Sequence, residues 1–339
     1  MTGRTFETRR VGRTDLYVTT LGLGGASLAG NYTPVPADQA RATIAHALDA
    51  GITLFDTAPH YGFGRSEHLF GDVLRERRAG AVLSTKVGRL LRPVHGQPWP
   101  RDEWIDPLPF REVYDYSYEG IMRSFEDSLQ RLGLEAIDIL YVHDIGTLTH
   151  GVDGNRPLWA QLAGGGYRAL RELRDAGTVK AIGLGVNEWP VLMEAMDLGQ
   201  WDVFLLAGRY TLLEQTALDP FLTACLRHGA SVVAGGPFNS GILVGGSRFD
   251  YARAPEAIIE KVRAIEAVCR DFDVPLPAAA LHFPLTHPAV CNVLPGPRSP
   301  QELDGILEWW DTEIPDGLWT ALVEKGLLAE GTPVPGGAA

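Results

Sequence analysis

Cysteine is scarce in this sequence, and its few copies form no pattern. The chain has three cysteines among 339 residues, widely spaced and each in apolar surroundings (Cys225, Cys269 and Cys291). An odd number at such spacing argues against a disulfide framework and against a cysteine-based metal site. We therefore expect three reduced core thiols in a cytoplasmic protein.

Long hydrophobic runs and an excess of positive charge are also missing. No segment approaches the ~20 apolar residues that a membrane span needs, and residues 1–7 contain no apolar run typical of a signal peptide. The formal net charge is −12, whereas nucleic acids and anionic membranes attract basic surfaces. A small molecule is therefore the expected partner, and the chain is expected to be a monomer or a small homo-oligomer.

Histidine spacing that suits a metal is absent as well. The nine histidines include no His-x-His or His-x-x-x-His pair that would place two ligands side by side. We therefore expect no metal, which disfavours a metal-dependent hydrolase. A hydrophobic content of 45% and a charged content of 21% are instead typical of a soluble globular protein.

Short apolar strands alternate with amphipathic helices along most of the chain. Eight segments have the character of buried parallel strands, at 19–23, 52–55, 81–86, 137–143, 181–185, 203–206, 231–235 and 290–294. Helical patterns lie between them, so the chain is predicted to form an α/β fold, a single (β/α)8 (TIM) barrel over residues 1–330. A β-hairpin within 7–18 precedes it, and helices at 300–310 and 315–325 close it. Residues 331–339 are expected to form a flexible tail.

Other segments are less regular. A doubly wound sheet would need a Gly-x-Gly-x-x-Gly fingerprint after its first strand, but residues 22–27 lack the third glycine, so we interpret them as a tight turn. Residues 87–117 and 144–166 are expected to be long irregular loops, of the kind that often act as lids or binding loops. Ser66 and Asp219 are expected to cap the helices that follow them.

Three neighbouring strands end on side chains that can do chemistry. The first leads into Asp56, the second ends on Lys86 and the third on His143, with Tyr61 in the loop after Asp56. Because sites in a barrel form at the carboxyl ends of the strands, these four residues are expected to converge. Lys86 would lower the pKa of the Tyr61 phenol, and Asp56 would keep Lys86 charged and oriented.

Each of these residues also has an ordinary structural interpretation. A loop tyrosine commonly serves packing, a strand-end aspartate commonly caps the next loop, and a strand-end histidine is commonly a satisfied core residue. Placed together at the ends of adjacent strands, the four favour an acid–base site in which Tyr61 transfers the proton.

The same residues resemble the aldo-keto reductase superfamily. The motif Asp-Thr-Ala-x-x-Tyr-Gly at 56–62, then Ser66-Glu67, Thr85-Lys86 and a strand ending in histidine, match that family's pattern, and the resemblance covers nearly the whole chain. It implies a tyrosine that donates or accepts the proton, a lysine and an aspartate that tune it, a histidine that orients the carbonyl, and a nicotinamide cofactor that carries the hydride. These roles fall on Tyr61, Lys86, Asp56 and His143.

The resemblance also indicates where the cofactor would bind. Residues 294–300 match the family's loop before the last helix, where the backbone near Gly296 and the side chain of Arg298 would hold the phosphate and adenosine end beside a helix N-terminus. Asn187 matches the position that binds the carboxamide. The family's stacking tyrosine is replaced here by Gly235 and Gly236, so the ring would lie on backbone or on another side chain.

Three departures from the family pattern leave the choice between NAD and NADP open. Val186 stands where the family has a serine, and Ala207 stands where it has a glutamine. Glu302 lies near the expected adenosine end and would repel a 2′-phosphate. The cofactor is therefore expected to be NAD or NADP, with a slight preference for NAD.

Residues 58–67 and 205–213 resemble one branch of the superfamily, with bacterial aldose 1-dehydrogenases for L-fucose, D-threo-aldoses and L-galactose and with pyridoxal 4-dehydrogenase. The resemblance implies oxidation of the C1 hemiacetal of a neutral aldose to a lactone, with Tyr61 as the base. The expected substrate contacts are His60, Trp104 and Trp189. A pyridoxal 4-dehydrogenase and a general aldehyde or ketone reductase are the enzymatic alternatives, and a cofactor-binding auxiliary subunit is the non-enzymatic one.

Overall fold

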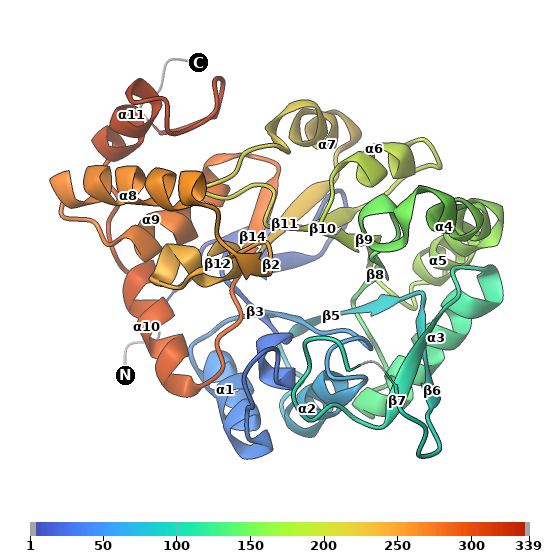
Figure 1. The fold of residues 1–339 in the computed structure, drawn as a ribbon. Helices are drawn as coiled ribbons and strands as arrows, with labels where there is room; N and C mark the ends of the chain where they lie inside the picture. The colour runs from blue at the N-terminus through green and yellow to red at the C-terminus, as the bar shows by residue number, and fades with distance from the viewer. Residues whose placement is uncertain (1–4, 100, 336–339) are drawn as a thin grey trace.

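The computed structural model describes residues 5–99 and 101–335 and shows a closed parallel barrel (Figure 1). Eight strands are hydrogen-bonded in the order β14-β11-β10-β9-β8-β5-β4-β3. A parallel bridge between Leu21 and Val293 joins the two ends of that order and closes the ring. The predicted α/β class and the (β/α)8 barrel are confirmed.

The barrel strands are short and largely buried on both faces. Every residue of β5 and of β8 is buried, as expected for parallel strands covered by helices outside and by side chains inside. The strands are β3 Gly22–Gly24, β4 Leu54–Asp56, β5 Val82–Val87, β8 Ile139–His143, β9 Ala181–Val186, β10 Val203–Ala207, β11 Ser231–Gly235 and β14 Val290–Leu294.

Helices form the outer layer around the strands (Figure 1). They are α1 Ala37–Asp49, α2 Arg65–Leu74, α3 Tyr118–Leu132, α4 Thr147–Gln161, α5 Tyr167–Asp175, α6 Pro190–Met196, α7 Thr223–His228, α8 Glu256–Asp271, α9 Leu276–His282, α10 Pro300–Trp310 and α11 Asp316–Glu324. The larger hydrophobic core lies between these helices and the strands. The last two helices are the closing helices that the sequence predicts.

A second, smaller core fills the barrel and is closed by the N-terminal hairpin. Strand β1 Thr8–Arg10 pairs antiparallel with β2 Tyr17–Thr19. Val11 and Val18 of the hairpin pack with inward-facing strand residues, and Arg9 Nη1 donates to the carbonyl oxygen of Val290, the first residue of β14, at 2.9 Å. The hairpin therefore covers the amino ends of the strands, and the carboxyl ends form the opposite mouth.

The two segments predicted to be irregular contain regular structure, so that prediction is wrong. Residues 87–117 hold an antiparallel pair, β6 Arg89–Pro93 with β7 Phe110–Tyr114. Residues 144–166 hold α4, which is kinked at Gly151, and the π-helical turn η2 Leu162–Gly166. A further short pair, β12 Arg248–Phe249 with β13 Ala252–Arg253, follows β11.

The helix ends also differ from the prediction at two places. Ser66 lies inside α2, where its hydroxyl accepts from Thr57 Oγ1 at 2.8 Å and donates to the carbonyl oxygen of Gly25 at 3.1 Å. Asp219 precedes α7 in a non-helical conformation. Neither residue is the cap of its helix, because tertiary contacts and the local backbone set the helix starts.

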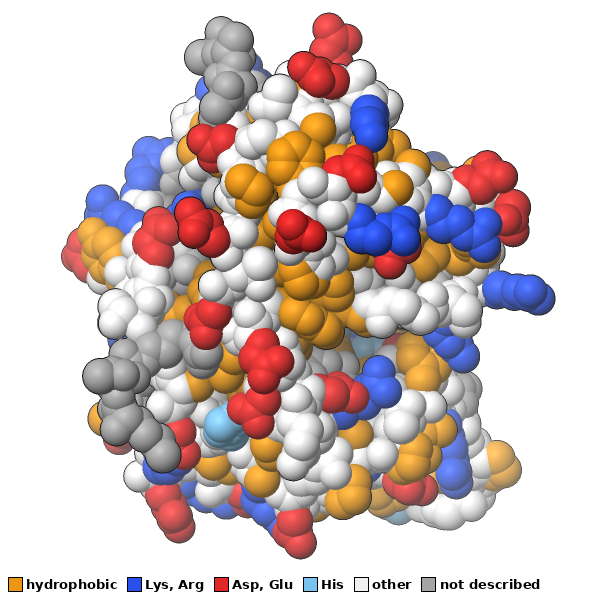
Figure 2. Space-filling model, turned by 90° about the vertical axis from the view of Figure 1, so that its left-hand side faces the viewer, with side chains coloured by type: hydrophobic (Ala, Val, Ile, Leu, Met, Phe, Trp, Pro, Cys, Tyr) orange, Lys and Arg blue, Asp and Glu red, His pale blue; other side chains and the backbone are white. Residues whose placement is uncertain are grey.

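The remaining expectations concern the surface and the end of the chain. No helix within 5–99 and 101–335 is long and apolar enough to cross a membrane, and acidic and basic side chains are interspersed on the face that includes α8 and α10 (Figure 2). Residues 336–339 of the expected tail lie outside the described residues. Before them, the Thr332 hydroxyl is buried and donates to the carbonyl oxygen of Ala329 at 2.7 Å. The domain boundary at 330 stays a prediction.

Candidate active site

Asp56, Lys86 and His143 lie together at the carboxyl ends of three adjacent strands. Asp56 ends β4, Lys86 is next to the last residue of β5, and His143 ends β8. Tyr61 lies in the loop between β4 and α2. The structure therefore brings the four predicted catalytic residues to one mouth of the barrel.

A buried ion pair lies at the centre of this group. Lys86 Nζ donates to Asp56 Oδ2 at 2.6 Å and to the carbonyl oxygen of Thr57 at 2.9 Å. The other carboxylate oxygen of Asp56 accepts from the Ser84 hydroxyl at 2.7 Å. Burial raises the pKa of the Asp56 carboxyl, and the ammonium of Lys86 opposes that rise. Each partner therefore compensates the charge of the other in a site closed to water.

Tyr61 lies against this pair and against the imidazole of His143. Lys86 Nζ lies 4.6 Å from the centroid of the Tyr61 ring. The His143 ring meets the Tyr61 ring edge to face, with centroids 5.9 Å apart. A phenol flanked by an ammonium and an imidazole can exchange a proton with a substrate oxygen that enters between the two rings.

Burial works against ionisation of Tyr61. It raises the pKa of the phenol well above its ordinary value, and the negative charges of Asp56 and Asp144 raise it further. The lowering that we predicted from Lys86 is therefore not what the structure shows. The phenol keeps its proton at neutral pH unless another positive charge faces the ring.

His143 is held as a neutral imidazole. Burial lowers its pKa well below the ordinary value, and the positive charges of Arg89 and Lys86 lower it further. Nε2 lies 3.4 Å from Asp144 Oδ2, and the Tyr116 hydroxyl donates to the backbone oxygen of His143 at 2.7 Å. Nδ1 is buried and has no hydrogen-bond partner among the described residues, so the ring retains hydrogen-bonding capacity for a ligand.

An aromatic wall borders Tyr61. Trp104 is 3% exposed and belongs with Phe63 to a small buried cluster. Its ring centroid lies 5.8 Å from that of Tyr61 and 5.2 Å from that of His60. Two of the three expected substrate contacts, His60 and Trp104, thus lie beside the tyrosine. Trp189 instead lies at the start of α6 and packs against the larger core, so its role stays a prediction.

Four charged residues that the sequence did not single out also surround the site. Arg89, at the start of β6, binds Glu112 of β7 (Nη1 to Oε2, 2.9 Å) and Asp144, the residue after β8. Glu112 in turn lies 2.7 Å from His60 Nδ1, and Glu103 lies 3.8 Å from His60 Nε2. The pairing of β6 with β7 brings Arg89 and Glu112 together, and the sequence did not reveal it because the stretch that carries these strands has no clear periodicity.

A sequence model of the protein family described as "Aldo/keto reductase family" matches residues 20–326 of this chain. The chain belongs to the aldo-keto reductase family. This aldo-keto reductase is therefore an oxidoreductase of a family that uses nicotinamide cofactors and acts on small molecules.

Two relatives of this aldo-keto reductase match almost its full length. Pyridoxal 4-dehydrogenase of Microbacterium luteolum is 48% identical over 95% of this chain and 98% of the relative. D-threo-aldose 1-dehydrogenase of a Pseudomonas species is 39% identical over 92% of this chain and 95% of the relative. An aldo-keto reductase of Bacillus halodurans, solved in its holo form, superimposes with a TM-score of 0.73 at 24% identity, covering 97% and 98% of the two chains. The predicted resemblance is confirmed.

The other half of the mouth of this aldo-keto reductase has residues that fit a nicotinamide cofactor. Asn187 follows β9, and Gly235 and Gly236 stand at the end of β11. A β-carbon added at Gly236, where φ is 59°, would meet no described atom closer than 3.8 Å. An amide beside a stretch of bare backbone suits a carboxamide and a flat ring.

The connection between β14 and α10, where the phosphate and adenosine end of the cofactor is expected, carries a negative side chain as well as a helix N-terminus. Gly296 approaches Ser27 so closely that a β-carbon would lie 2.9 Å from its hydroxyl oxygen. Ser299 caps α10 by accepting from the Glu302 amide at 3.1 Å. The Glu302 carboxylate accepts from the backbone amide of the exposed Arg298 at 2.8 Å. A negative side chain therefore already lies at the helix N-terminus that would attract a phosphate.

The short pair β12–β13 lies beside the expected carboxamide contact, which the sequence did not predict. The Tyr251 hydroxyl donates to Asn187 Oδ1 at 3.3 Å. Asp250 binds Arg209 Nη1 at 2.8 Å, and Arg209 Nε donates to the backbone oxygen of Asn187 at 2.8 Å. Both the side chain and the backbone of Asn187 are thus oriented by neighbours.

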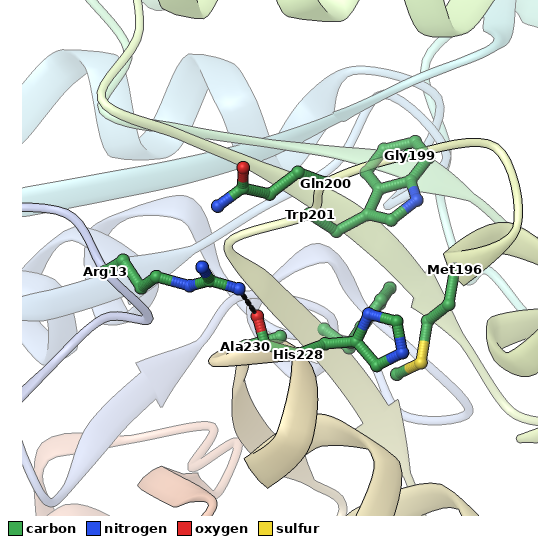
Figure 3. A pocket seen from close by; sticks show the side chains of 8 residues that line it. Arg13, Met196, Gly199, Gln200, Trp201, His228 and Ala230 are labelled. Atoms are coloured by element: carbon green, nitrogen blue, oxygen red, sulfur yellow. Dashed lines mark hydrogen bonds between the residues drawn. The ribbon is translucent and has the colours of Figure 1, made fainter.

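A cavity of about 290 Å³ lies at the opposite end of the barrel (Figure 3). The Arg13 guanidinium donates to the carbonyl oxygen of His228 across it. Its lining comes from the N-terminal hairpin, from α6 and β10, and from the segments before β10 and β11, so it is separate from the mouth that holds Tyr61. The lining residues are Arg13, Met196, Gly199, Gln200, Trp201, Phe204, His228 and Ala230.

Proposed function

We propose that this protein is a nicotinamide-dependent dehydrogenase that oxidises a cyclic hemiacetal to a lactone, with Tyr61 as the general base. The observation that carries the proposal is the buried Lys86–Asp56 pair against Tyr61, next to a neutral His143. This group suits proton transfer at an oxygen. The two full-length relatives are both dehydrogenases by name, which supports the direction of oxidation.

The proposed reaction breaks two bonds to hydrogen. The Tyr61 phenol would first lose its own proton to solvent, a step that its raised pKa disfavours and a mildly alkaline pH favours. The phenolate would then accept the proton of the hemiacetal hydroxyl while the C–H bond of the same carbon gives up a hydride, so the C–O bond becomes the lactone carbonyl. An oxidised nicotinamide, when bound, would supply the acceptor for that hydride. Asn187 and the backbone of Gly235 and Gly236 would hold the nicotinamide. His143 would hydrogen-bond the reacting oxygen and keep it directed at Tyr61.

A pyridoxal-type substrate is the first candidate among hemiacetals. The aldehyde of pyridoxal closes on its neighbouring hydroxymethyl group, so its oxidation gives a lactone just as that of a cyclic aldose does. The buried face of Trp104, beside Tyr61 and His60, suits an aromatic ring. The sequence motifs favoured an aldose as the first candidate, but the 48% identity to a pyridoxal 4-dehydrogenase supports placing pyridoxal before it.

A free aldose is the second candidate. The D-threo-aldose 1-dehydrogenase is 39% identical over nearly the same length. A tryptophan face also suits the C–H face of a sugar ring, and His60 could bind a sugar hydroxyl. Both substrates share the hemiacetal and therefore the same use of Tyr61.

The experiment that tests the function is the formation of reduced nicotinamide, followed by absorbance, from NAD and separately from NADP. The substrates would be pyridoxal, L-fucose, L-galactose and D-arabinose at mildly alkaline pH, where the high pKa of Tyr61 obstructs the reaction least. We expect turnover of pyridoxal and a lactone product by mass spectrometry. Turnover of the sugars alone would instead assign the aldose.

The matched variant for this assay is Tyr61→Phe, which removes only the hydroxyl. We expect its turnover to fall by about a thousandfold, the range typical of a lost acid–base group, while cofactor binding measured by fluorescence stays close to that of the wild type. A variant that keeps most of its rate contradicts the mechanism whichever substrate is oxidised.

A further inference from the structure

A chain of charged side chains connects the two imidazoles beside Tyr61. His60 Nδ1 lies 2.7 Å from Glu112 Oε1, and Glu112 Oε2 accepts from Arg89 Nη1 at 2.9 Å. The other terminal nitrogen of Arg89 donates to Asp144 Oδ2, and the same oxygen lies 3.4 Å from His143 Nε2. One arginine thus bridges the two carboxylates that touch the two imidazoles.

The backbone places Arg89 at this bridging position. Within the β6–β7 pair, Glu112 lies opposite Leu91, which is two residues from Arg89. The side chains of Arg89 and Glu112 therefore lie on the same face of the pair. The chain passes from β5 into β6 through Gly88, whose φ is 99°, and a β-carbon there would lie 2.3 Å from the Tyr116 ring. A residue with a side chain would not fit this turn, so the direction of Arg89 is set locally.

The burial of Arg89 requires both carboxylates. The side chain is 5% exposed, and its Cζ lies 5.3 Å from the centroid of the Tyr114 ring. Nε has no hydrogen-bond partner among the described residues. A buried guanidinium is tolerated only where carboxylates pair with it. The planar fork of arginine can bind Glu112 and Asp144 at once, which the single ammonium of lysine does not do in the same geometry.

The two imidazoles and Tyr61 face one another. The ring centroids of His60 and His143 are 5.8 Å apart, and those of His60 and Tyr61 are 6.3 Å apart. The three rings therefore surround the place where a substrate oxygen reaches the Tyr61 hydroxyl. Any rotation of either imidazole would change how that oxygen is held.

We propose that Arg89 is a positioning residue: by binding Glu112 and Asp144 together, it fixes the imidazoles of His60 and His143 on either side of the substrate oxygen. The kinetic consequence rests on the proposed function, whereas the arrangement of the two imidazoles does not depend on the substrate.

The charges around each imidazole differ and make the effect measurable. Burial and the positive charge of Arg89 act to lower the pKa of His60, but the carboxylates of Glu103 and Glu112 outweigh them and raise it. For His143, burial and the positive charges of Arg89, Lys86 and His60 all lower the pKa. The Asp144 carboxylate lies 3.4 Å from His143 Nε2, and once it is no longer paired with Arg89 it would favour the protonated ring. Freeing Asp144 from Arg89 therefore raises the pKa of His143.

The test compares Arg89→Lys and Arg89→Met with the wild type. Lysine keeps the charge but releases one carboxylate, and methionine releases both. We expect the pKa of His143, followed by NMR of the imidazole protons and assigned with His143→Asn, to rise in both variants and more in Arg89→Met. We also expect kcat/KM to fall by about tenfold or more, mainly through kcat, with its acidic limb shifted to higher pH.

The matched control is Arg78→Lys. Arg78 binds the buried Asp138 at the amino ends of β5 and β8, away from the catalytic mouth, so this variant loses stability without a change in the pH profile. If the Arg89 variants behave like it, with unshifted imidazoles and an unchanged profile, the positioning role is overturned. If the wild type oxidises no hemiacetal, the proposed function fails, and the NMR titration still decides whether Arg89 fixes the imidazoles.

Discussion

At the scale of single residues, the Lys86–Asp56 pair combines structural and chemical roles that can be separated. Both oxygens of the Asp56 carboxylate accept hydrogen bonds, and the Lys86 ammonium donates to that carboxylate and to a backbone carbonyl. Removing one member of such a pair leaves a buried, uncompensated charge, which typically costs about 3–5 kcal/mol. Removing both members leaves no charge to compensate. Stability therefore depends on both charges being present together or absent together, whereas the proposed catalysis depends on the Lys86 ammonium itself.

This difference leads to a prediction for a double-mutant cycle. Lys86→Met should lower the free energy of unfolding by about 3 kcal/mol or more, because Asp56 then lies buried without a cation. Lys86→Met combined with Asp56→Asn should regain most of that loss in urea unfolding but none of the dehydrogenase activity. A double variant that turns over like the wild type would remove Lys86 from the mechanism. One that is no more stable than the single variant would show that the two charges are not coupled.

The convergence of Asp56, Tyr61, Lys86 and His143 at one mouth could be predicted because each lies at or just after the end of a strand whose apolar run is plain in the sequence. Their chemistry was harder to predict. Proximity of Lys86 to Tyr61 suggested a lowered phenol pKa, but burial and three carboxylates raise it. Desolvation depends on the complete packing around the ring, which no local pattern records.

At the scale of elements, helices and strands with strong hydrophobic periodicity could be predicted from the sequence, whereas those held in place by tertiary contacts could not. Helix α10 was predicted with its observed bounds, whereas α4 was missed because Gly151 and Pro157 are poor helix formers. The β6–β7 pair was missed because its strands are distant in sequence and the intervening segment is rich in proline. Its position is set by the contacts of Arg89 and Glu112, and these residues escaped prediction with it.

The start of α10 leads to a prediction about cofactor choice. We expect the adenosine end of the cofactor near this helix, where the Glu302 carboxylate accepts from the Arg298 amide. A 2′-phosphate there would meet the negative charge of Glu302. Glu302→Gln should therefore raise kcat/KM with NADP relative to NAD by up to about tenfold, since one surface charge is removed.

The control for this prediction is Glu308→Gln, which removes the same charge from an exposed position later on α10. Its ratio of NADP to NAD use should equal that of the wild type. If the ratio of kcat/KM with NADP to that with NAD is equal in the wild type and both variants, Glu302 does not face the ribose, and the expected slight preference for NAD is no longer supported.

At the scale of the whole molecule, the proposed roles divide the mouth of the barrel into two arcs. Strands β4, β5 and β8 carry Asp56, Lys86 and His143, whereas the expected cofactor residues follow β9, β11 and β14. The bridge between Leu21 and Val293 makes these arcs parts of one ring. Packing that holds β14 in place therefore supports the site as well as the fold.

His287, three residues before the start of that closing strand, couples the stability of the whole fold to pH. It is 5% exposed, its Nδ1 accepts from the Ala289 amide at 3.1 Å, and its ring meets that of Tyr210 edge to face. Burial lowers the pKa of His287 to about 4 from its usual 6.5. The unfolded chain therefore binds a proton near pH 6.5, while the folded protein does so only near pH 4.

The sign of this linkage predicts an acid-sensitive contribution to stability. His287 stabilises the fold fully above about pH 6.5, and its contribution falls as the pH drops towards about 4. His287→Asn keeps an acceptor for the Ala289 amide but cannot be protonated, so it should be less stable than the wild type at neutral pH and lose less stability over this window. Urea unfolding at successive pH values measures the difference in the free energy of unfolding between the wild type and His287→Asn. We expect this difference to become smaller as the pH falls.

The control is His68→Asn, at an exposed position on α2. Its difference in the free energy of unfolding from the wild type should not become smaller in this way. If the difference in the free energy of unfolding between His287→Asn and the wild type stays constant with pH, His287 takes up its proton equally readily in the folded and unfolded chains.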